Sequence, residues 1–133
     1  MKYMLDTNIC IYLIKNKNEH LISKIINQKS SDICISSIVY SKLMYGVLHS
    51  NQVEKNFIAL TMFLRNIEII DFDSKAAIEY GYIKNELSKQ GTPIGPFDCL
   101  IAGHAKSLDI TLITNNEKEF NRINNLKIEN WAK

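Results

Sequence analysis

Short apolar runs alternate with longer segments of helical periodicity along the whole chain, and this alternation most constrains the fold. Strands are expected at 2–5, 32–35, 67–70, 110–113 and, at a sheet edge, 126–128. Helices are expected at 8–15, 20–28, 37–49, 53–64, 74–90, 97–108 and 117–120, with Ser36 or Ser37 capping the third and Asp73 the fifth. Because no two-residue hairpin turn joins the strands, helical crossovers must connect them. The prediction is an α/β fold, a three-layer α/β/α sandwich with a central, mainly parallel sheet, formed by a single domain at 1–133.

The composition excludes several classes of protein. With 46% hydrophobic and 23% charged residues, the chain is not expected to be disordered, and a net charge of +2 is too small to indicate a nucleic-acid partner. No apolar run approaches the roughly 20 residues that a membrane helix needs. The three cysteines lack Cys-x-x-Cys spacing and lie in apolar stretches, as buried thiols do. We therefore predict a cytoplasmic protein with no membrane partner.

Two aspartates stand at the polar ends of apolar segments, Asp6 after the first strand and Asp98 after a connection rich in Gly and Pro. Each alone is compatible with helix capping. In parallel sheets, however, the functional crevice lies beyond the carboxyl ends of the strands, where 115–116 also falls. Clustered carboxylates repel one another unless a cation compensates them, and oxygen ligands suit Mg²⁺ or Mn²⁺. The sequence has no zinc-type spacing, phosphate loop or dinucleotide fingerprint.

Five ordered motifs resemble the VapC toxins of the PIN-domain nucleases. They are Met4–Ile9, Ile35–Ile38 with Leu43–Gly46, Gly91–Asp98, Ile101–Ala105 and Thr114–Phe120, and together they span essentially the whole chain. The resemblance implies a Mg²⁺-dependent endoribonuclease, with Mn²⁺ able to substitute, that is inhibited by a VapB-like antitoxin inserted into its catalytic groove. It also implies a homodimer that reaches operator DNA only through the antitoxin. The VapC toxins most similar in these motifs cut initiator tRNA in the anticodon stem-loop, leaving a 5′-phosphate and a 3′-hydroxyl.

Carried over to this chain, the resemblance makes Asp6 and Asp98 the metal-binding aspartates. Asn116 falls where VapC toxins have Asp or Asn, and Glu119 adds a nearby carboxylate. A receiver-like or dehalogenase-like phosphotransfer domain is a weaker interpretation, because the second acidic residue expected two positions after Asp6 is absent.

The chain departs from the family at Lys42, where the VapC toxins carry a Glu before Tyr-Gly. One hypothesis is that the ammonium, about 3–5 Å from both aspartates, takes the space and charge of the cation and impairs catalysis. The other is that Lys42 extends toward solvent and leaves a weaker metal site at Asp6, Asp98 and Asn116. If catalysis is lost, the chain would be a silent protein of the same fold that binds the antitoxin and acts in regulation.

Other side chains have simpler interpretations. His104 is expected to be a core or groove-lining residue rather than a general base. A basic rim around the groove is predicted from Lys15, Lys17, Lys24, Lys84 and Lys89. Five apolar residues of the two middle helices are assigned to the core, with a dimer interface or antitoxin groove as alternatives: Leu43, Met44, Phe57, Leu60 and Phe63.

Overall fold

The computed structural model describes all residues, 1–133, and contains one five-stranded sheet in the order β3-β2-β1-β4-β5. Every pair of neighbouring strands is parallel, as predicted. The strands are β1 Tyr3–Leu5, β2 Ile33–Ser36, β3 Glu68–Ile70, β4 Thr111–Ile113 and β5 Ile128–Glu129. The prediction for the last strand began two residues too early, because pairing with β4 sets its position and places Ile128 beside Leu112.

Seven α-helices connect and cover the strands. They are α1 Thr7–Ile14, α2 Glu19–Ile26, α3 Ser37–Leu48, α4 Val53–Leu64, α5 Ser74–Gln90, α6 Pro96–Ser107 and α7 Glu117–Phe120. Two predicted caps are confirmed: Ser36 Oγ accepts the Ile38 N–H at 3.0 Å, and Asp73 Oδ1 accepts the Ala76 N–H at 3.0 Å. A 3₁₀ turn at Ser30–Asp32 was not expected.

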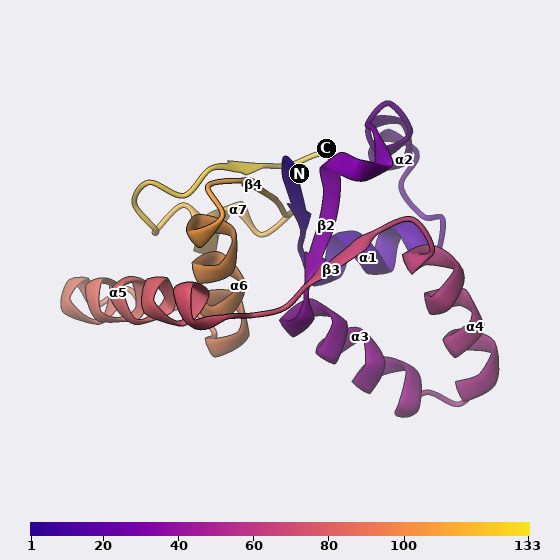
Figure 1. Ribbon diagram of the computed structural model, residues 1–133, viewed down its shortest axis with the longest axis horizontal. Coiled ribbons are helices and arrows are strands. Elements are labelled where there is room, and N and C mark those ends of the chain that lie inside the picture. The colour runs from indigo at the N-terminus through magenta and orange to yellow at the C-terminus, as the bar shows by residue number, and fades with distance from the viewer.

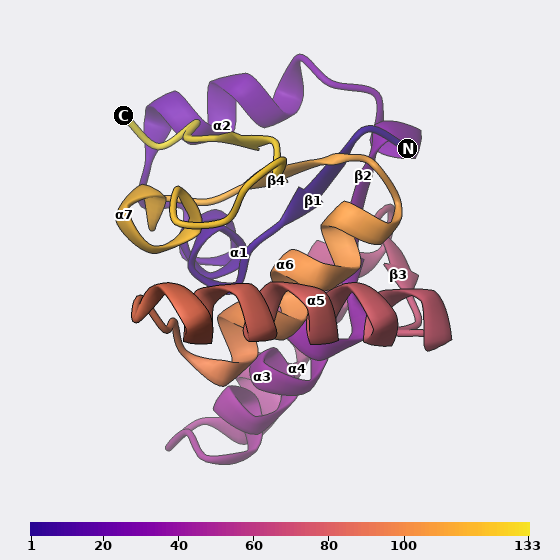
Figure 2. The same ribbon diagram turned by 90° about the vertical axis from the view of Figure 1, so that its left-hand side faces the viewer.

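The helices form two layers around the sheet, which confirms the three-layer sandwich. Figure 1 shows α1, α3 and α4 on one side of the strands and α5 and α6 on the other. Seen from the side in Figure 2, α5 crosses over α6. The crossing is close because Gly103 has no side chain: a Cβ there would lie 2.8 Å from the backbone nitrogen of Tyr80. No helix has the length and apolar character needed to cross a membrane.

Apolar side chains from both layers and from both faces of the sheet form a cluster of 24 buried residues. The cysteines Cys10, Cys34 and Cys99 are free and buried, as predicted. Among the apolar residues of α3 and α4, the core assignment is confirmed for Leu43 and Leu60. It is wrong for Phe57, whose side chain is 46% exposed because it lies on the outer side of α4.

Candidate active site

The site lies at the carboxyl ends of β1 and β4, which are neighbours at the centre of the sheet. The chain passes from β1 to β2 on one side, whereas β4 lies on the other, so the strand order changes direction here. Crevices form at such points in open parallel sheets. Asp6 follows β1 directly and Thr114 follows β4 directly, which places both residues at the same end of the sheet.

Asp6 is held by two hydrogen bonds and is only 5% exposed. Its Oδ1 accepts the Thr7 N–H at 2.8 Å, which caps α1, and its Oδ2 accepts the Thr114 hydroxyl at 2.8 Å. Burial raises the pKa of Asp6, while the two hydrogen bonds and the charge of Lys42 act in the opposite direction. Asp6 is therefore both a helix cap and a fixed carboxylate at the crevice.

Asp98 stands in the first turn of α6, where Gly95 and Pro96 turn the chain into the helix. Burial raises the pKa of Asp98 to about 7, and a hydrogen bond with Glu119 and the charges of Asp6 and Glu119 contribute to the rise. The structure thus brings Asp6 and Asp98, 92 positions apart in sequence, close enough for each to belong to one electrostatic site.

Glu119 and Asn116 complete the acidic cluster from the segment after β4. Asn116 Nδ2 donates to Glu119 Oε2 at 2.6 Å, and the Asn116 N–H donates to Thr114 Oγ1 at 3.0 Å. The hydrogen bond with Asp98, followed by that with Asn116, lowers the pKa of Glu119. Asp98 and Glu119 therefore titrate as one interacting pair of carboxyl groups.

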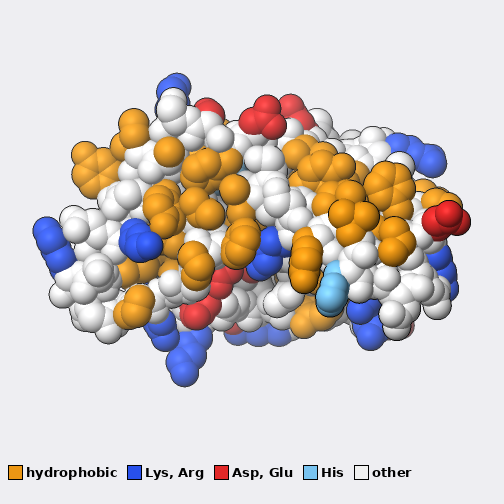
Figure 3. Space-filling model, turned by 90° about the horizontal axis from the view of Figure 1, so that it is seen from below, with side chains coloured by type: hydrophobic (Ala, Val, Ile, Leu, Met, Phe, Trp, Pro, Cys, Tyr) orange, Lys and Arg blue, Asp and Glu red, His pale blue; other side chains and the backbone are white.

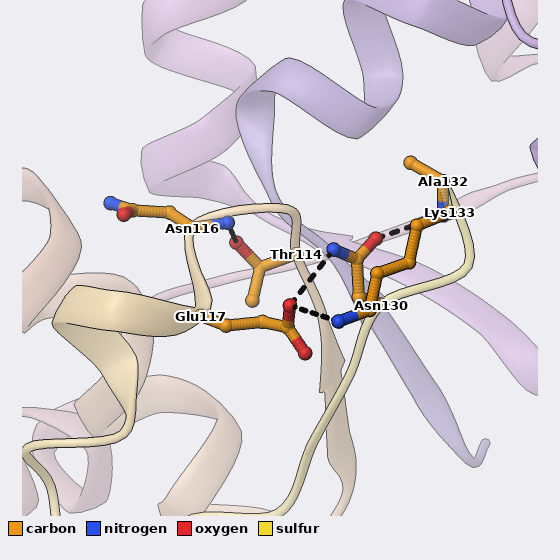
Figure 4. A network of polar contacts seen from close by, with 6 residues as sticks. All are labelled: Thr114, Asn116, Glu117, Asn130, Ala132 and Lys133. Carbon is orange, nitrogen blue, oxygen red and sulfur yellow. Dashed lines mark hydrogen bonds and ion pairs between the residues drawn. The ribbon is translucent and has the colours of Figure 1, made fainter.

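The turn that carries Asn116 is separated from a second polar network in the C-terminal tail. In Figure 4 the Asn116 side chain extends away from Glu117, Asn130 and Lys133, which bind one another. Thr114, fully buried, links this turn to Asp6. Thr114 belongs to the motif Thr114–Phe120, but no role was predicted for it from the sequence. The only local indication of a role was its hydroxyl group directly after an apolar strand.

Lys42 reaches the acidic cluster from α3 without forming a direct pair. Its charge lowers the pKa of both Asp6 and Asp98, so the ammonium lies within the field of both carboxylates. None of the three ion pairs of the structure includes Lys42. Instead its Nζ lies 5.3 Å from the ring centroid of Phe97, a residue that sequence reasoning did not single out. No N–O distance of 4.0 Å or less joins Lys42 to either aspartate, and its side chain is partly buried.

The oxygen atoms of this site suit a divalent cation by their chemistry, but the acidic side chains are not arranged as a set of metal ligands. All donors are oxygens, which suits Mg²⁺ or Mn²⁺, and the raised pKa values of both aspartates reflect an environment that a cation would relieve. However, no three His, Cys, Asp or Glu side chains are grouped closely enough to hold a metal ion. The carboxyl groups of Asp6 and Asp98 are suitable ligands for a divalent ion, whereas the positive charge of Lys42 opposes its binding.

The remaining predicted residues divide between core and surface. His104 is buried at 1% exposure, its Nδ1 lies 2.8 Å from Ser36 Oγ, and burial lowers its pKa, which confirms the core assignment. Of the lysines proposed for a basic rim, Lys15 borders a cavity of about 300 Å³ together with Lys42. Lys17 and Lys84 border two other hollows.

Residues 3–126 match the PIN domain. The chain belongs to the PIN-domain family. This PIN domain is 46% identical, over 99% of both chains, to a protein of Salmonella typhimurium named tRNA(fMet)-specific endonuclease VapC, and 48% identical, over the full length of both, to ribonuclease VapC2 of Rickettsia felis. Among solved structures it resembles VapBC2 of Rickettsia felis bound to a promoter DNA fragment, with a TM-score of 0.92 and 45% identity over 98% of this chain and 99% of that one. The DNA-bound VapBC of Salmonella typhimurium gives a TM-score of 0.93 and 46% identity over 98% of each chain. The resemblance to VapC toxins is confirmed.

Proposed function

We propose that this PIN domain is the toxin of a type II toxin–antitoxin pair and a metal-dependent endoribonuclease that acts on tRNA. The observation that carries the proposal is the convergence of Asp6, Asp98 and Glu119, from three distant segments, at the central crevice of the sheet. Relatives named as tRNA(fMet)-specific endonucleases support initiator tRNA as the substrate.

In this proposal Asp6 and Asp98 hold Mg²⁺, or Mn²⁺ in its place. The bound ion would lower the pKa of a water molecule and offset negative charge on the phosphate. Asp6 is preset for this role because Thr7 and Thr114 fix both of its oxygens. Burial and the neighbouring carboxyl groups raise the pKa of Asp98 to about 7, so binding of the ion would release a proton from this carboxyl group to solvent. Asn116 orients Glu119 through its amide.

We infer that Lys42 weakens metal binding and so slows cleavage. Its positive charge acts on both carboxylates that would hold the ion, and like charges in one site oppose each other. The same observation favours a second candidate function, that of a catalytically silent protein that still binds the antitoxin and serves in regulation.

A cleavage assay tests the enzyme proposal and separates it from the silent alternative. Purified wild-type protein, Asp98→Asn and Lys42→Glu would each be incubated with initiator tRNA and Mg²⁺, with an elongator tRNA as substrate control. We expect slow cleavage by the wild type, faster cleavage by Lys42→Glu and none by Asp98→Asn. Asp6→Asn should also abolish cleavage while keeping the cap of α1, because Asn caps a helix as well as Asp does, so its loss of activity would not reflect a lost helix cap. If neither the wild type nor Lys42→Glu cuts the tRNA, the enzyme proposal fails.

The partner in this proposal is a VapB-like antitoxin that covers the groove and carries any contact with operator DNA. The solved VapBC complexes of similar chains support this assembly, including two bound to DNA. We further propose a homodimer in the cytoplasm, where the free thiols of the three buried cysteines would be kept reduced. Co-expression with the antitoxin and light scattering of the purified complex would test both the pairing and the stoichiometry.

A further inference from the structure

Phe97 is an aromatic residue whose exposure the fold does not explain. Its ring is 47% exposed and is absent from the buried apolar cluster and from the side chains packed against it. It directly precedes Asp98, which places it at the border of the acidic site. Lys42 Nζ lies 5.3 Å from the ring centroid. An exposed ring and an ammonium therefore stand together beside the carboxylates.

The ammonium of Lys42 is available to a ligand. It takes part in none of the ion pairs of the structure, although its charge acts on Asp6 and Asp98. An ammonium offers three hydrogen-bond donors and no acceptor. A polyanion that approaches a group of carboxylates needs a positive charge there, and Lys42 supplies a charge that acts on both aspartates.

We propose that Phe97 and Lys42 bind RNA in the absence of a metal ion, with an unpaired base stacked on the Phe97 ring and the adjacent phosphate on the Lys42 ammonium. Aromatic side chains accept any base on their faces, and proteins read single-stranded loops in this way. The inference rests on the proposed function in one respect, that RNA enters this crevice. It does not require that the RNA be cut.

The surroundings of Phe97 favour a nucleic acid over a protein partner. Several exposed apolar side chains that could meet another protein belong to α3 and α4, namely Tyr45, Leu48, Phe57, Ile58 and Met62. Figure 3 shows apolar areas over both halves of the lower face, with basic and acidic side chains between them. Phe97, by contrast, has an ammonium over its ring. A phosphate-bearing base matches that combination of ring and charge.

Fluorescence anisotropy with a labelled RNA stem-loop in EDTA tests the proposal, since no cleavage occurs without the ion. We expect Phe97→Ala to weaken binding about five- to hundredfold and Phe97→Trp to retain it. Lys42→Met should weaken binding and make the dependence of log K on log salt shallower by about 0.7 for a single strand. Tyr82→Ala and Lys29→Met, which change an exposed ring on α5 and an exposed lysine before the 3₁₀ turn, should bind as the wild type does.

A fully paired RNA of the same composition separates stacking from charge. Phe97→Ala should bind this duplex like the wild type, because no base is free to stack, whereas Lys42→Met should bind it more weakly. Phe97→Leu keeps the apolar bulk and loses the flat ring, so it should resemble Phe97→Ala on the stem-loop. That second variant keeps the test decisive even if Phe97→Ala lowers the melting temperature.

Unchanged stem-loop affinity in Phe97→Ala and Phe97→Leu would overturn the proposal. So would variants that lose capture of a co-expressed antitoxin but keep RNA affinity, because the ring would then be a protein contact. Failure of the nuclease proposal gives a different result. If RNA binding depends on Phe97 but Lys42→Glu does not cleave, the nuclease proposal is wrong and the RNA contact is supported. If Lys42→Glu cleaves and RNA binding does not depend on Phe97, only the proposed RNA contact is wrong.

Discussion

Replacing Lys42 by Glu should convert a weak metal site into a strong one. At an effective dielectric constant near 20, a dication about 5 Å from an ammonium is repelled by about 7 kcal/mol, and a carboxylate there attracts it by a similar amount. The actual gain is smaller, because Lys42 is only partly buried and its ammonium can swing away from an incoming ion. We take about 3 kcal/mol as the expected gain in binding free energy, which is about a hundredfold in Kd for Mn²⁺.

Isothermal titration with Mn²⁺ measures this change directly, and thermal unfolding provides a second measurement. Without metal, Lys42→Glu should melt below the wild type, because it adds a fourth carboxylate to a cluster in which burial and neighbouring charges already raise the pKa of Asp98 to about 7. Added Mn²⁺ should restore its melting temperature, since an ion that binds only the folded state stabilises it.

Lys42→Met is the matched control, because it removes the ammonium and adds no ligand. Its Mn²⁺ affinity should rise by about tenfold, between the wild type and Lys42→Glu. Equal affinity in all three proteins would show that the ammonium does not act on the ion, and the electrostatic reasoning would be wrong. Equal affinity in the two variants alone would show that Glu at this position is not a ligand.

Three further predictions concern protonation, packing and the hydrogen bonds that hold the site. Because the pKa of Asp98 is about 7 and an ion needs the carboxylate, Mn²⁺ affinity should fall as the pH drops below about 7, and Glu119→Gln should move this fall to lower pH in titrations across the range. Gly103→Ala should lower the unfolding free energy in urea by about 1–3 kcal/mol, since its Cβ would meet the α5 backbone at 2.8 Å, whereas Gly81→Ala, with open space around it, should be neutral or stabilising. Thr114→Val should cost about 1–3 kcal/mol in the same assay by leaving a buried carboxylate oxygen and a backbone N–H without a partner; an unchanged midpoint would contradict this.

The parts of the fold that were predictable depend on local chemistry. Ser36 and Asp73 cap their helices through their own side chains, so the helix starts could be read from a few neighbouring residues. The parallel sheet followed from the alternation of strand and helix patterns. The last strand could not be placed as well, because its limits depend on β4: the Leu112 N–H binds the carbonyl oxygen of Lys127, and Ile128 pairs beside Leu112. Such pairing is invisible to a local pattern.

The candidate site shows the same division. The position of Asp6 followed from a general rule about strand ends, whereas Asp98 lies at a helix start and its role was implied by the family resemblance; the structure brings their charges into one site. The role of Thr114 did not follow, since its hydroxyl meets a carboxylate 108 positions away and a threonine after a strand has many other uses. The direction of the Lys42 side chain was equally hidden, because it depends on a ring in α6.

A lysine beside the acidic site is compatible with an intact fold because α3 is anchored elsewhere. Val39, Leu43 and Val47 form the buried stripe of this helix, whereas Lys42 lies beside the stripe and is only partly buried. Its aliphatic stem can lie along the helix while the ammonium meets the acidic crevice. Packing therefore places few demands on the charge at position 42, and the close overall similarity to VapC structures says little about the charge there. A change between Glu and Lys at position 42 alters the charge of the site by two units without altering the fold. The activity of this chain therefore has to be tested by substitution of Lys42.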